Sequence, residues 1–334
     1  MSYIYKLLKK SFTFRRLLNL LKLHLCYIIS IIIKKPIIWG YPSIVMIEPT
    51  NLCNLQCPLC PSGAGLLNRP QGFITFDLFK KIIDEIKFDS FLILLWNQGE
   101  PFLHKDIIKM IEYAHLQKMI VILSTNANVF PDPNELIVSG LDLLIISMDG
   151  VEQETYNKYR VNGELEKVIE NVKKLIKAKD DKSKSNPRTI CQFIVMKHNE
   201  HEIKEIESLV RKIKIDQIVL KTVQIYTKED IENFLPKNPK YQRYKIKDND
   251  FNMKYNIKNR CYRMWNRPVV NCDGEMSICC YDKNNVYKIG NLKNKRLIDI
   301  WKSKEYHTFR QNILKNRKMY DICRNCGEGI SLKI

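Results

Sequence analysis

Three cysteines, Cys53, Cys57 and Cys60, carry the clearest chemical signal in this sequence. They form a C-x3-C-x2-C pattern after an apolar, strand-like run at residues 43–47. Three thiolates on a four-iron cluster leave one iron without a protein ligand, and that iron can bind a small molecule. A structural zinc site needs a fourth protein ligand, yet the next histidine is His104 and the next cysteine is Cys191. The spacing favours a catalytic cluster, with a zinc knuckle or inert cysteines as the alternative.

A second group of cysteines lies near the end of the chain. Its regularly spaced members are Cys261, Cys279, Cys323 and Cys326. Four thiolates suit either an iron–sulfur cluster or a zinc ion, so both readings stay open from spacing alone. Cys272 lies outside the pattern, and Cys280 is adjacent to Cys279, so the sequence does not distinguish these two neighbours. Cys26 and Cys191 are interpreted as small buried hydrophobic residues.

The residues that must position these cysteines alternate between two patterns. Strand-like apolar runs occupy residues 44–47, 91–96, 120–123, 143–147, 190–196 and 217–221. Helical patterns lie between them at residues 77–86, 106–117, 134–139, 165–178 and 202–213. This alternation predicts an α/β fold with parallel strands joined by right-handed crossovers. Six units are too few for a closed eight-stranded barrel, so we expect an open, partial (β/α)6 TIM-like barrel.

Polar clusters follow four successive predicted strands. The cysteine loop follows the first, and the others are residues 97–101 (Asn-Gln-Gly-Glu-Pro), 124–127 (Ser-Thr-Asn-Ala) and 147–150 (Ser-Met-Asp-Gly). Each cluster alone reads as a turn or a helix cap. Active sites of such barrels gather at the carboxyl ends of the strands. Four clusters at the same end therefore predict one shared site.

With these motifs, the chain resembles the radical S-adenosylmethionine (SAM) superfamily, whose signature is C-x3-C-x2-C after the first barrel strand. The resemblance implies that Cys53, Cys57 and Cys60 hold a [4Fe-4S] cluster whose open iron chelates SAM. One electron then cleaves SAM to a 5′-deoxyadenosyl radical that abstracts hydrogen from a substrate. The protein contributes binding, orientation and exclusion of side reactions.

The resemblance also implies the residues that contact SAM. Residues 98–101 are similar to the family's Gly-Gly-Glu-Pro motif, with Gln98 in place of the first glycine, which puts a close backbone approach there in doubt. The backbone of Gln98 and Gly99, with the Glu100 carboxylate, would accept hydrogen bonds from the SAM ammonium group. The other matching positions are Ser124 and Asn126 after the third strand and Ser147 and Asp149 on the ribose side.

Two further SAM contacts each have an ordinary alternative. Arg160 is a candidate partner for the SAM carboxylate, because guanidinium pairs with carboxylates through two hydrogen bonds; otherwise it faces solvent. Asn199 is a candidate contact to adenine; otherwise it caps the helix that begins near Glu202. Asp282, beside the paired cysteines, is an untested candidate for a general base.

The C-terminal cysteines resemble those of the SPASM, or shortened twitch, auxiliary domain. That resemblance implies a second, auxiliary [4Fe-4S] cluster with Cys261, Cys279, Cys323 and Cys326 as ligands. The expected organisation is an N-terminal segment at residues 1–40, a radical SAM core at 41–225, a linker at 226–260 and the auxiliary domain at 261–334. The family further implies a flavodoxin or ferredoxin as electron donor.

Charge is strongly asymmetric at the N-terminus. The formal net charge is +19, and eight basic residues precede the first acidic one, Glu48. No basic-aromatic nucleic-acid module is readable, so no specific nucleic-acid partner is expected. The longest mostly apolar stretch, residues 25–33, is shorter than the ~18–20 residues of a membrane span. The N-terminal segment is either an amphipathic helix on a membrane surface or a helix packed across the barrel's open side or end.

The combined patterns predict a cytoplasmic radical SAM enzyme. Clustered cysteines and the absence of a cleavable leader favour a reducing compartment. The expected reaction is oxidation or rearrangement of an unidentified sugar, other small molecule or peptide, with the auxiliary cluster as electron acceptor. The alternative is a non-catalytic zinc- or cluster-binding protein that docks on membrane or nucleic acid through its basic surface.

Overall fold

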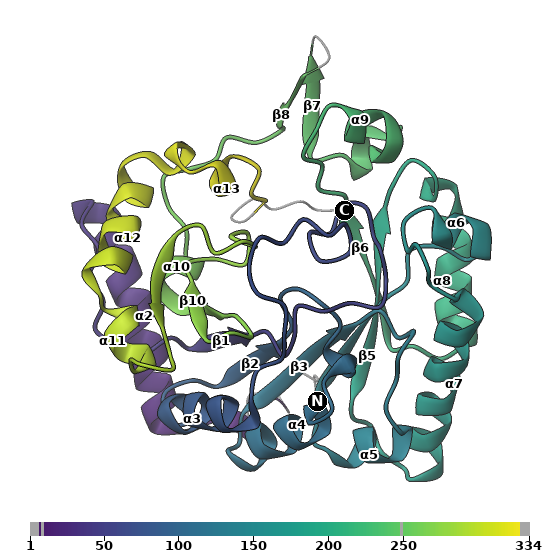
Figure 1. The fold of residues 1–334 in the computed structure, drawn as a ribbon, viewed down its shortest axis with the longest axis horizontal. Coiled ribbons are helices and arrows are strands. Elements are labelled where there is room, and N and C mark those ends of the chain that lie inside the picture. Colours follow the sequence, from purple (N-terminus) through teal and green to yellow (C-terminus); the bar gives the residue numbers. More distant parts are fainter. Residues whose placement is uncertain (1–6, 8–9, 248–249, 328–334) are drawn as a thin grey trace.

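The computed structural model describes residues 7, 10–247 and 250–327. Its main feature is a nine-stranded sheet that curves around a central space, with helices on its outer side (Figure 1). The strand order is β11-β10-β9-β1-β2-β3-β4-β5-β6. The first six strands are β1 (Ile44–Ile47), β2 (Leu92–Leu95), β3 (Ile120–Thr125), β4 (Leu143–Ser147), β5 (Arg188–Val195) and β6 (Gln217–Thr222). They pair in parallel from β1 to β6, which confirms the predicted partial barrel.

Helices connect these strands as the sequence predicted. They are α3 (Phe76–Ile86), η1 (Pro101–Leu103), α4 (Ile107–Leu116), α5 (Pro133–Val138), α6 (Gln153–Asn157), α7 (Leu165–Asp181), η2 (Glu200–Glu202) and α8 (Ile203–Lys212). The α3 helix starts where Thr75 accepts a hydrogen bond from the backbone of Leu78, a typical N-cap. Shortly after α5, Gly140 adopts a φ of +87°, a conformation that suits glycine at a helix end. These local signals set the crossovers.

Side chains on the barrel strands alternate between two environments. Those that point toward the helices are fully buried in the main core, as at Val45, Ile93 and Val121. Those of the opposite row form a separate small cluster around Met46 and Leu94. Many residues of that row are only half-buried, namely Ile44, Leu92, Ile122, Ser124, Ile145, Gln192 and Ile194. The inner face of the sheet is therefore less tightly covered than the outer face, which suits a barrel that admits ligands.

The C-terminal module extends the same sheet. Its strands are β9 (Val269–Val270), β10 (Glu275–Ser277) and β11 (Lys288–Asn291). The short β9 pairs in parallel with β1, and β10 and β11 continue in antiparallel fashion. Its helices are α10 (Arg263–Asn266), α11 (Leu297–Trp301), α12 (Lys304–Asn316), η4 (Arg317–Met319) and α13 (Asp321–Arg324). The sequence did not predict that the module would continue the barrel sheet.

Residues 226–260, predicted as a linker, contain secondary structure of their own. The elements are α9 (Glu229–Phe234), η3 (Pro239–Tyr241) and a hairpin of β7 (Tyr244–Lys247) and β8 (Asp250–Met253). The hairpin stands apart from the barrel sheet (Figure 1). Tyr244 is fully buried against the cysteine loop, so this segment is also packed onto the barrel. The proposed domain boundaries stay a prediction.

The N-terminal helix α2 (Phe14–Ile33) packs across the amino end of the barrel. Arg16 donates hydrogen bonds to the carbonyls of Lys87, Gln117 and Lys118, just before β2 and β3. Packing across the barrel was one of the two predicted arrangements. By length and composition, α2 is the one helix in the described part of the chain that could cross a membrane. The sequence estimate from residues 25–33 was too short, because single polar residues interrupt a longer apolar helix. Residues 1–6, 8 and 9, with their lysines, lie outside the described residues.

Candidate active site

The cysteine loop follows β1 at the carboxyl end of the barrel. Cys57 is buried, and Cys53 and Cys60 are half-buried. Burial raises the pKa of the Cys53 thiol to about 12, and it also raises the pKa of Cys57. Thiolates in such a place need positive charge beside them, which a bound metal centre provides when it deprotonates its ligands. The donor set therefore fits an iron–sulfur cluster.

Arg160 and Asp149 lie directly beside this loop. The Arg160 guanidinium donates to the Asp149 carboxylate at 2.7 Å and reaches Cys57 Sγ at 3.7 Å. Its side chain is only 13% exposed, and Asp149 is fully buried. The solvent-facing alternative for Arg160 is therefore wrong. Burial raises the pKa of Asp149, and Arg160 opposes that shift. The pair brings a fixed positive group to the edge of the cysteine site.

Asn126 joins the end of β3 to the cysteine loop. Its side-chain amide donates to Asn54 at 2.9 Å and lies 3.8 Å from Cys53 Sγ. Ser124 is half-buried on the inner row of the same strand. Ser147 ends β4 and is paired in register with Gln192 of β5, two residues before Asp149. The structure thus brings Asn126 and Asp149 to the cysteines and leaves the two serines lower in the barrel.

The loop after β2 approaches the cysteine loop closely. Gly99 has a φ of +72°, and a Cβ there would lie 2.5 Å from the carbonyl oxygen of Thr50. This close contact explains why the position holds glycine. The Gln98 side chain, which replaces the first glycine of the family motif, turns toward the cysteine loop. Its oxygen accepts from the Ser62 backbone at 3.2 Å and lies 3.9 Å from Cys60 Sγ. Gln98 is therefore accommodated without loss of the tight approach at Gly99.

Glu100 ties the β2 and β3 loops together. Its carboxylate accepts from Thr125 Oγ1 at 2.8 Å, from the Asn126 backbone at 2.7 Å and from the Phe102 backbone at 3.0 Å. Glu100 is 1% exposed, and burial raises its pKa to about 7 despite these bonds. Within the described part of the chain, by contrast, no hydrogen bond uses the carbonyl oxygens of Gln98 and Gly99. The carbonyl oxygens of Gln98 and Gly99, rather than the Glu100 carboxylate, are therefore the candidate acceptors for a ligand.

Asn199 holds the turn between β5 and α8. Its amide nitrogen donates to the carbonyls of Asp149 and Ile194 at 3.0 Å each, and its oxygen accepts from the Met196 backbone. Asn199 occupies the N-cap position of η2, as the cap alternative expected, but among the described residues its side chain makes no cap bond. The physical reason is that Asn199 is fully buried and closes its own loop onto β4 instead. Asn199 therefore holds the backbone of Asp149 in place through its hydrogen bond to the Asp149 carbonyl.

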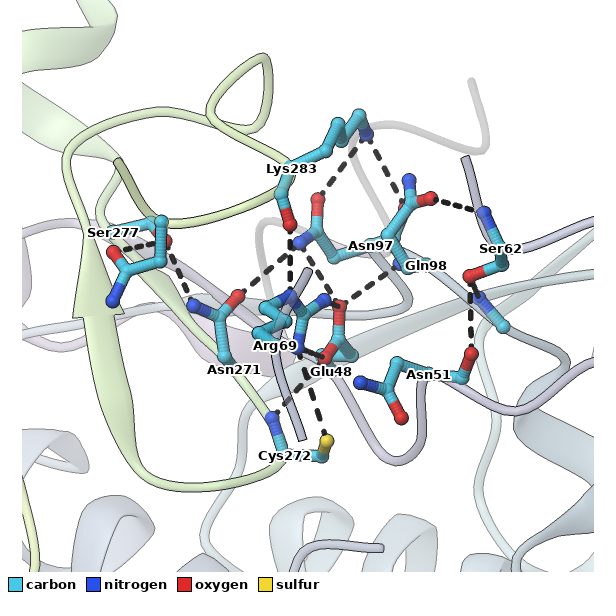
Figure 2. A network of polar contacts seen from close by, with 12 residues as sticks. Glu48, Asn51, Ser62, Arg69, Asn97, Gln98, Asn271, Cys272, Ser277 and Lys283 are labelled. Carbon is cyan, nitrogen blue, oxygen red and sulfur yellow. Dashed lines mark hydrogen bonds and ion pairs between the residues drawn. The ribbon is translucent and has the colours of Figure 1, made fainter. Parts of the chain in front are cut away.

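A buried ion pair that sequence reasoning missed connects this site to the C-terminal module (Figure 2). Glu48 pairs with Arg69 through two bonds of 2.7 and 2.6 Å, and their side chains are 0% and 4% exposed. Glu48 also accepts from the backbone of Gln98 at 3.1 Å and of Cys272 at 3.2 Å. Arg69 donates to the carbonyl of Lys283. The available signal was an acidic residue immediately after an apolar strand, at Glu48.

The C-terminal cysteines gather around Arg317. Its guanidinium donates to Cys326 Sγ at 3.2 Å and interacts electrostatically with Cys261 and Cys323. The pKa of Cys279 is raised by its bond to Cys280, by burial, and by the neighbouring thiols of Cys261 and Cys326. Cys261, Cys323 and Cys326 thus interact with Arg317, and Cys279 interacts with Cys261 and Cys326; that these four cysteines hold one cluster stays a prediction. Cys280, which accepts from Arg263 at 2.8 Å, lies beside them.

Two other predicted candidates of this module have structural partners. Cys272 lies apart from the auxiliary cysteines, in the Glu48–Arg69 network, with its sulfur 4.0 Å from Arg69. Asp282 is buried, and its carboxylate accepts from the backbones of Val286 and Tyr287 at 2.8 and 3.1 Å. This arrangement closes a loop and gives no support to Asp282 as a general base.

A buried contact path links the two cysteine sites. Tyr244 packs in one apolar cluster with Cys57 of the cysteine loop. Its hydroxyl donates to Asn325 at 2.6 Å, and Asn325 lies between Cys323 and Cys326. Asn325 also donates to the carbonyl of Ile225, just after β6. Both sites are therefore held at the carboxyl end of the barrel.

All eleven cysteines lie in the described ranges, and none forms a disulfide there. Among these residues, no three His, Cys, Asp or Glu side chains converge as ligands of one metal ion. A four-iron cluster binds each thiolate at a different iron, so its ligands are spread over its corners.

Known proteins share both parts of this arrangement. Residues 47–213 match the model of the radical SAM superfamily, and residues 261–327 match the SPASM iron–sulfur cluster-binding domain. The tungsten-containing aldehyde ferredoxin oxidoreductase cofactor-modifying protein of Pyrococcus furiosus is 27% identical over 311 residues, or 84% of this chain and 86% of that protein. A PqqA peptide cyclase of Bradyrhizobium diazoefficiens is 29% identical over 190 residues, which is 56% of this chain and 48% of the cyclase.

Solved structures share the fold at lower identity. SuiB of Streptococcus suis bound to SAM has a TM-score of 0.63 at 17% identity, covering 86% of this chain and 73% of SuiB. BtrN in complex with SAM and 2-DOIA has a TM-score of 0.54 at 18% identity, covering 87% of this chain and 94% of BtrN. Together with the cysteine geometry, the matched models establish that the chain belongs to the radical SAM superfamily and carries a SPASM iron–sulfur cluster-binding domain.

Proposed function

We propose that the chain binds SAM across the carboxyl ends of β1 to β5. Cys53, Cys57 and Cys60 hold the [4Fe-4S] cluster. The free carbonyls of Gln98 and Gly99 accept from the SAM ammonium group, and Arg160 pairs with the SAM carboxylate. The observation that carries this assignment is the guanidinium of Arg160, fixed by Asp149 at 2.7 Å and 3.7 Å from Cys57 Sγ.

The remaining predicted residues take supporting roles. Ser124 and Ser147 form the ribose side of the site, where hydroxyl groups suit ribose hydroxyls, and Asp149 supports that side by fixing Arg160. Glu100, Asn126 and Asn199 position the loops, because their side chains are engaged by protein groups. Asn199→Asp most directly separates a role in SAM binding from a role in positioning the loop. It keeps the size of the side chain and replaces the amide donors with acceptors.

The reaction we propose is a net two-electron oxidation of an organic substrate. When bound at Cys53, Cys57 and Cys60, the cluster with SAM would supply a one-electron cleavage of a carbon–sulfur bond of SAM and so a hydrogen-atom acceptor for the substrate. The resulting substrate radical loses a second electron and a proton. The cysteines of the C-terminal module hold the acceptor for that electron, and the contact path through Tyr244 and Asn325 supports their placement near the site.

The partners follow from this reaction. An electron donor such as flavodoxin or ferredoxin supplies the first electron, in a reducing cytoplasm that keeps the cysteines free. The substrate is a sugar, other small molecule or peptide. The relatives support this breadth, since they include a cofactor-modifying protein and a peptide cyclase.

The test is product analysis with anaerobically reconstituted protein, dithionite and SAM. We expect about eight irons per chain, as two four-iron clusters require, and formation of methionine and 5′-deoxyadenosine. With a deuterated substrate, deuterium should appear in 5′-deoxyadenosine. A colourless zinc protein without SAM cleavage would refute the proposal.

A further inference from the structure

The amino-terminal helix α2 exposes a row of large apolar side chains, while its buried side, which includes Leu23 and Cys26, also holds several polar side chains. Its buried residues include three polar ones, Arg16, Asn19 and Ser30. Its exposed side carries large apolar residues that mostly recur every three or four positions, namely Phe14, Leu17, Leu18, Leu21, Leu25, Ile28 and Ile32. Leu21 and Leu25 are each 51% exposed, and Ile32 is 73% exposed. We call these seven side chains the α2 face.

The buried polar residues explain this orientation. The Arg16 guanidinium donates hydrogen bonds to carbonyls that precede β2 and β3. The distance to the Lys118 carbonyl oxygen is 2.7 Å. Asn19 donates to the carbonyls of Tyr41 and Asp89 and accepts from the Tyr41 backbone. These bonds clamp the helix to the barrel through its polar side. Leu23 and Cys26 are fully buried on the same side, so these contacts fix the orientation of α2 and leave its other apolar row facing outward.

The surroundings of the α2 face are basic. Lys22, Lys34 and Lys35 are exposed on or just after the helix, and no acidic residue occurs in the first 47 positions. A shallow depression beside the start of the helix adds Lys118, with the exposed Phe88 and Leu116. Asp89, an acidic side chain at this end, is paired with Arg15 at 2.6 Å.

We propose that the α2 face docks the enzyme on an anionic membrane surface. Apolar side chains flanked by lysines are what an interfacial helix needs, since the first enter the acyl boundary and the second meet anionic headgroups. A second copy of the chain fits less well, because a two-fold contact would bring the same lysines against each other. A membrane span would pull Arg16 and Asn19 out of their bonds into lipid.

Docking in this way leaves the chemistry accessible. The first turns of α2 lie at the amino ends of the strands, as the bonds of Arg16 before β2 and β3 show, and its later turns pack against α10. The cysteine loop lies at the opposite, carboxyl end. The active site therefore faces away from the membrane, toward substrate and electron donor in solution. Membrane binding and SAM cleavage are separable properties.

The test is co-sedimentation of the full chain with vesicles of phosphatidylcholine alone or mixed with phosphatidylglycerol. We expect binding to the mixed vesicles, and a loss of about a hundredfold in the double variant Leu21→Glu/Leu25→Glu, since each buried leucine contributes a factor of about ten. The control is Val286→Glu, which places one glutamate on a 69% exposed apolar residue of the C-terminal module. It should bind as the unsubstituted chain does.

Other outcomes overturn the proposal. These are no binding to mixed vesicles, equal binding by the double variant, or a dimer in solution that the double variant dissociates, which would assign the face to a second copy. If the double variant loses iron or circular dichroism signal, Lys22→Glu/Lys35→Glu replaces it, because both side chains are exposed. That pair should weaken binding to the mixed vesicles, and unchanged binding would refute the inference.

Discussion

The buried Glu48–Arg69 pair gives the sharpest test of how the site is held together. In Arg69→Met, the Glu48 carboxylate stays in a place where it is 0% exposed and loses its only bidentate partner there. Removing one member of a buried ion pair costs about 3–5 kcal/mol. The remaining donors to Glu48, which are the Asn97 side-chain amide and the backbones of Gln98 and Cys272, favour the lower end, about 3 kcal/mol. This is a large part of a typical stability of about 5–15 kcal/mol.

The assay is urea unfolding of anaerobically purified protein, followed by circular dichroism. Arg69→Met should lower the free energy of unfolding, whereas Arg296→Met, which removes a surface partner of Asp299, should leave the midpoint unchanged. The double variant Glu48→Gln/Arg69→Met should recover part of the loss, because the uncompensated charge is gone. A loss below about 1 kcal/mol in Arg69→Met, or no recovery in the double variant, would show that the pair does not stabilise this junction.

Three further predictions address the cofactor sites. Gly99→Ala should abolish SAM binding measured by equilibrium dialysis with little loss of iron, because a Cβ at φ +72° would lie 2.5 Å from the Thr50 carbonyl; unchanged SAM affinity would contradict the proposed loop contact. Arg160→Met should weaken SAM binding more than Arg160→Lys, since lysine keeps the charge without the planar fork; equal affinities in both would remove Arg160 from the site. Cys323→Ala should lower iron from about eight to about four per chain and spare SAM cleavage, whereas loss of all iron would show that the two sites are not independent.

The parts of the fold that follow local rules were predictable. The apolar run predicted the bounds of β4, Leu143–Ser147, without error. The bounds of β1 were also predicted correctly. Parallel strands bring their carboxyl ends to one edge, so polar residues after successive strands had to meet there. That rule placed the cysteine loop, Gly99, Asn126 and Asp149 near one another before any coordinates.

The rest depended on contacts between distant segments. The two-residue strand β9 pairs with β1 across more than two hundred positions, a register that no local pattern encodes. The same holds for Arg69, which reaches Glu48 and Lys283. In α2, periodicity identified an amphipathic helix, but the bonds of Arg16 and Asn19 were needed to show which side faces the barrel. Asn199 was predicted to contact SAM or to cap a helix. In the structure its buried side chain also holds the turn after β5 onto the backbone of Asp149.

The measurement closest to the central claim is electron paramagnetic resonance of the reduced, oxygen-free protein with and without SAM. The claim is that Cys53, Cys57 and Cys60 leave one iron open to SAM. SAM should change the spectrum of the unsubstituted chain and of Cys323→Ala, and it should have no such effect on Cys57→Ala. A spectrum that ignores SAM in the unsubstituted chain, or that still responds in Cys57→Ala, would contradict the account.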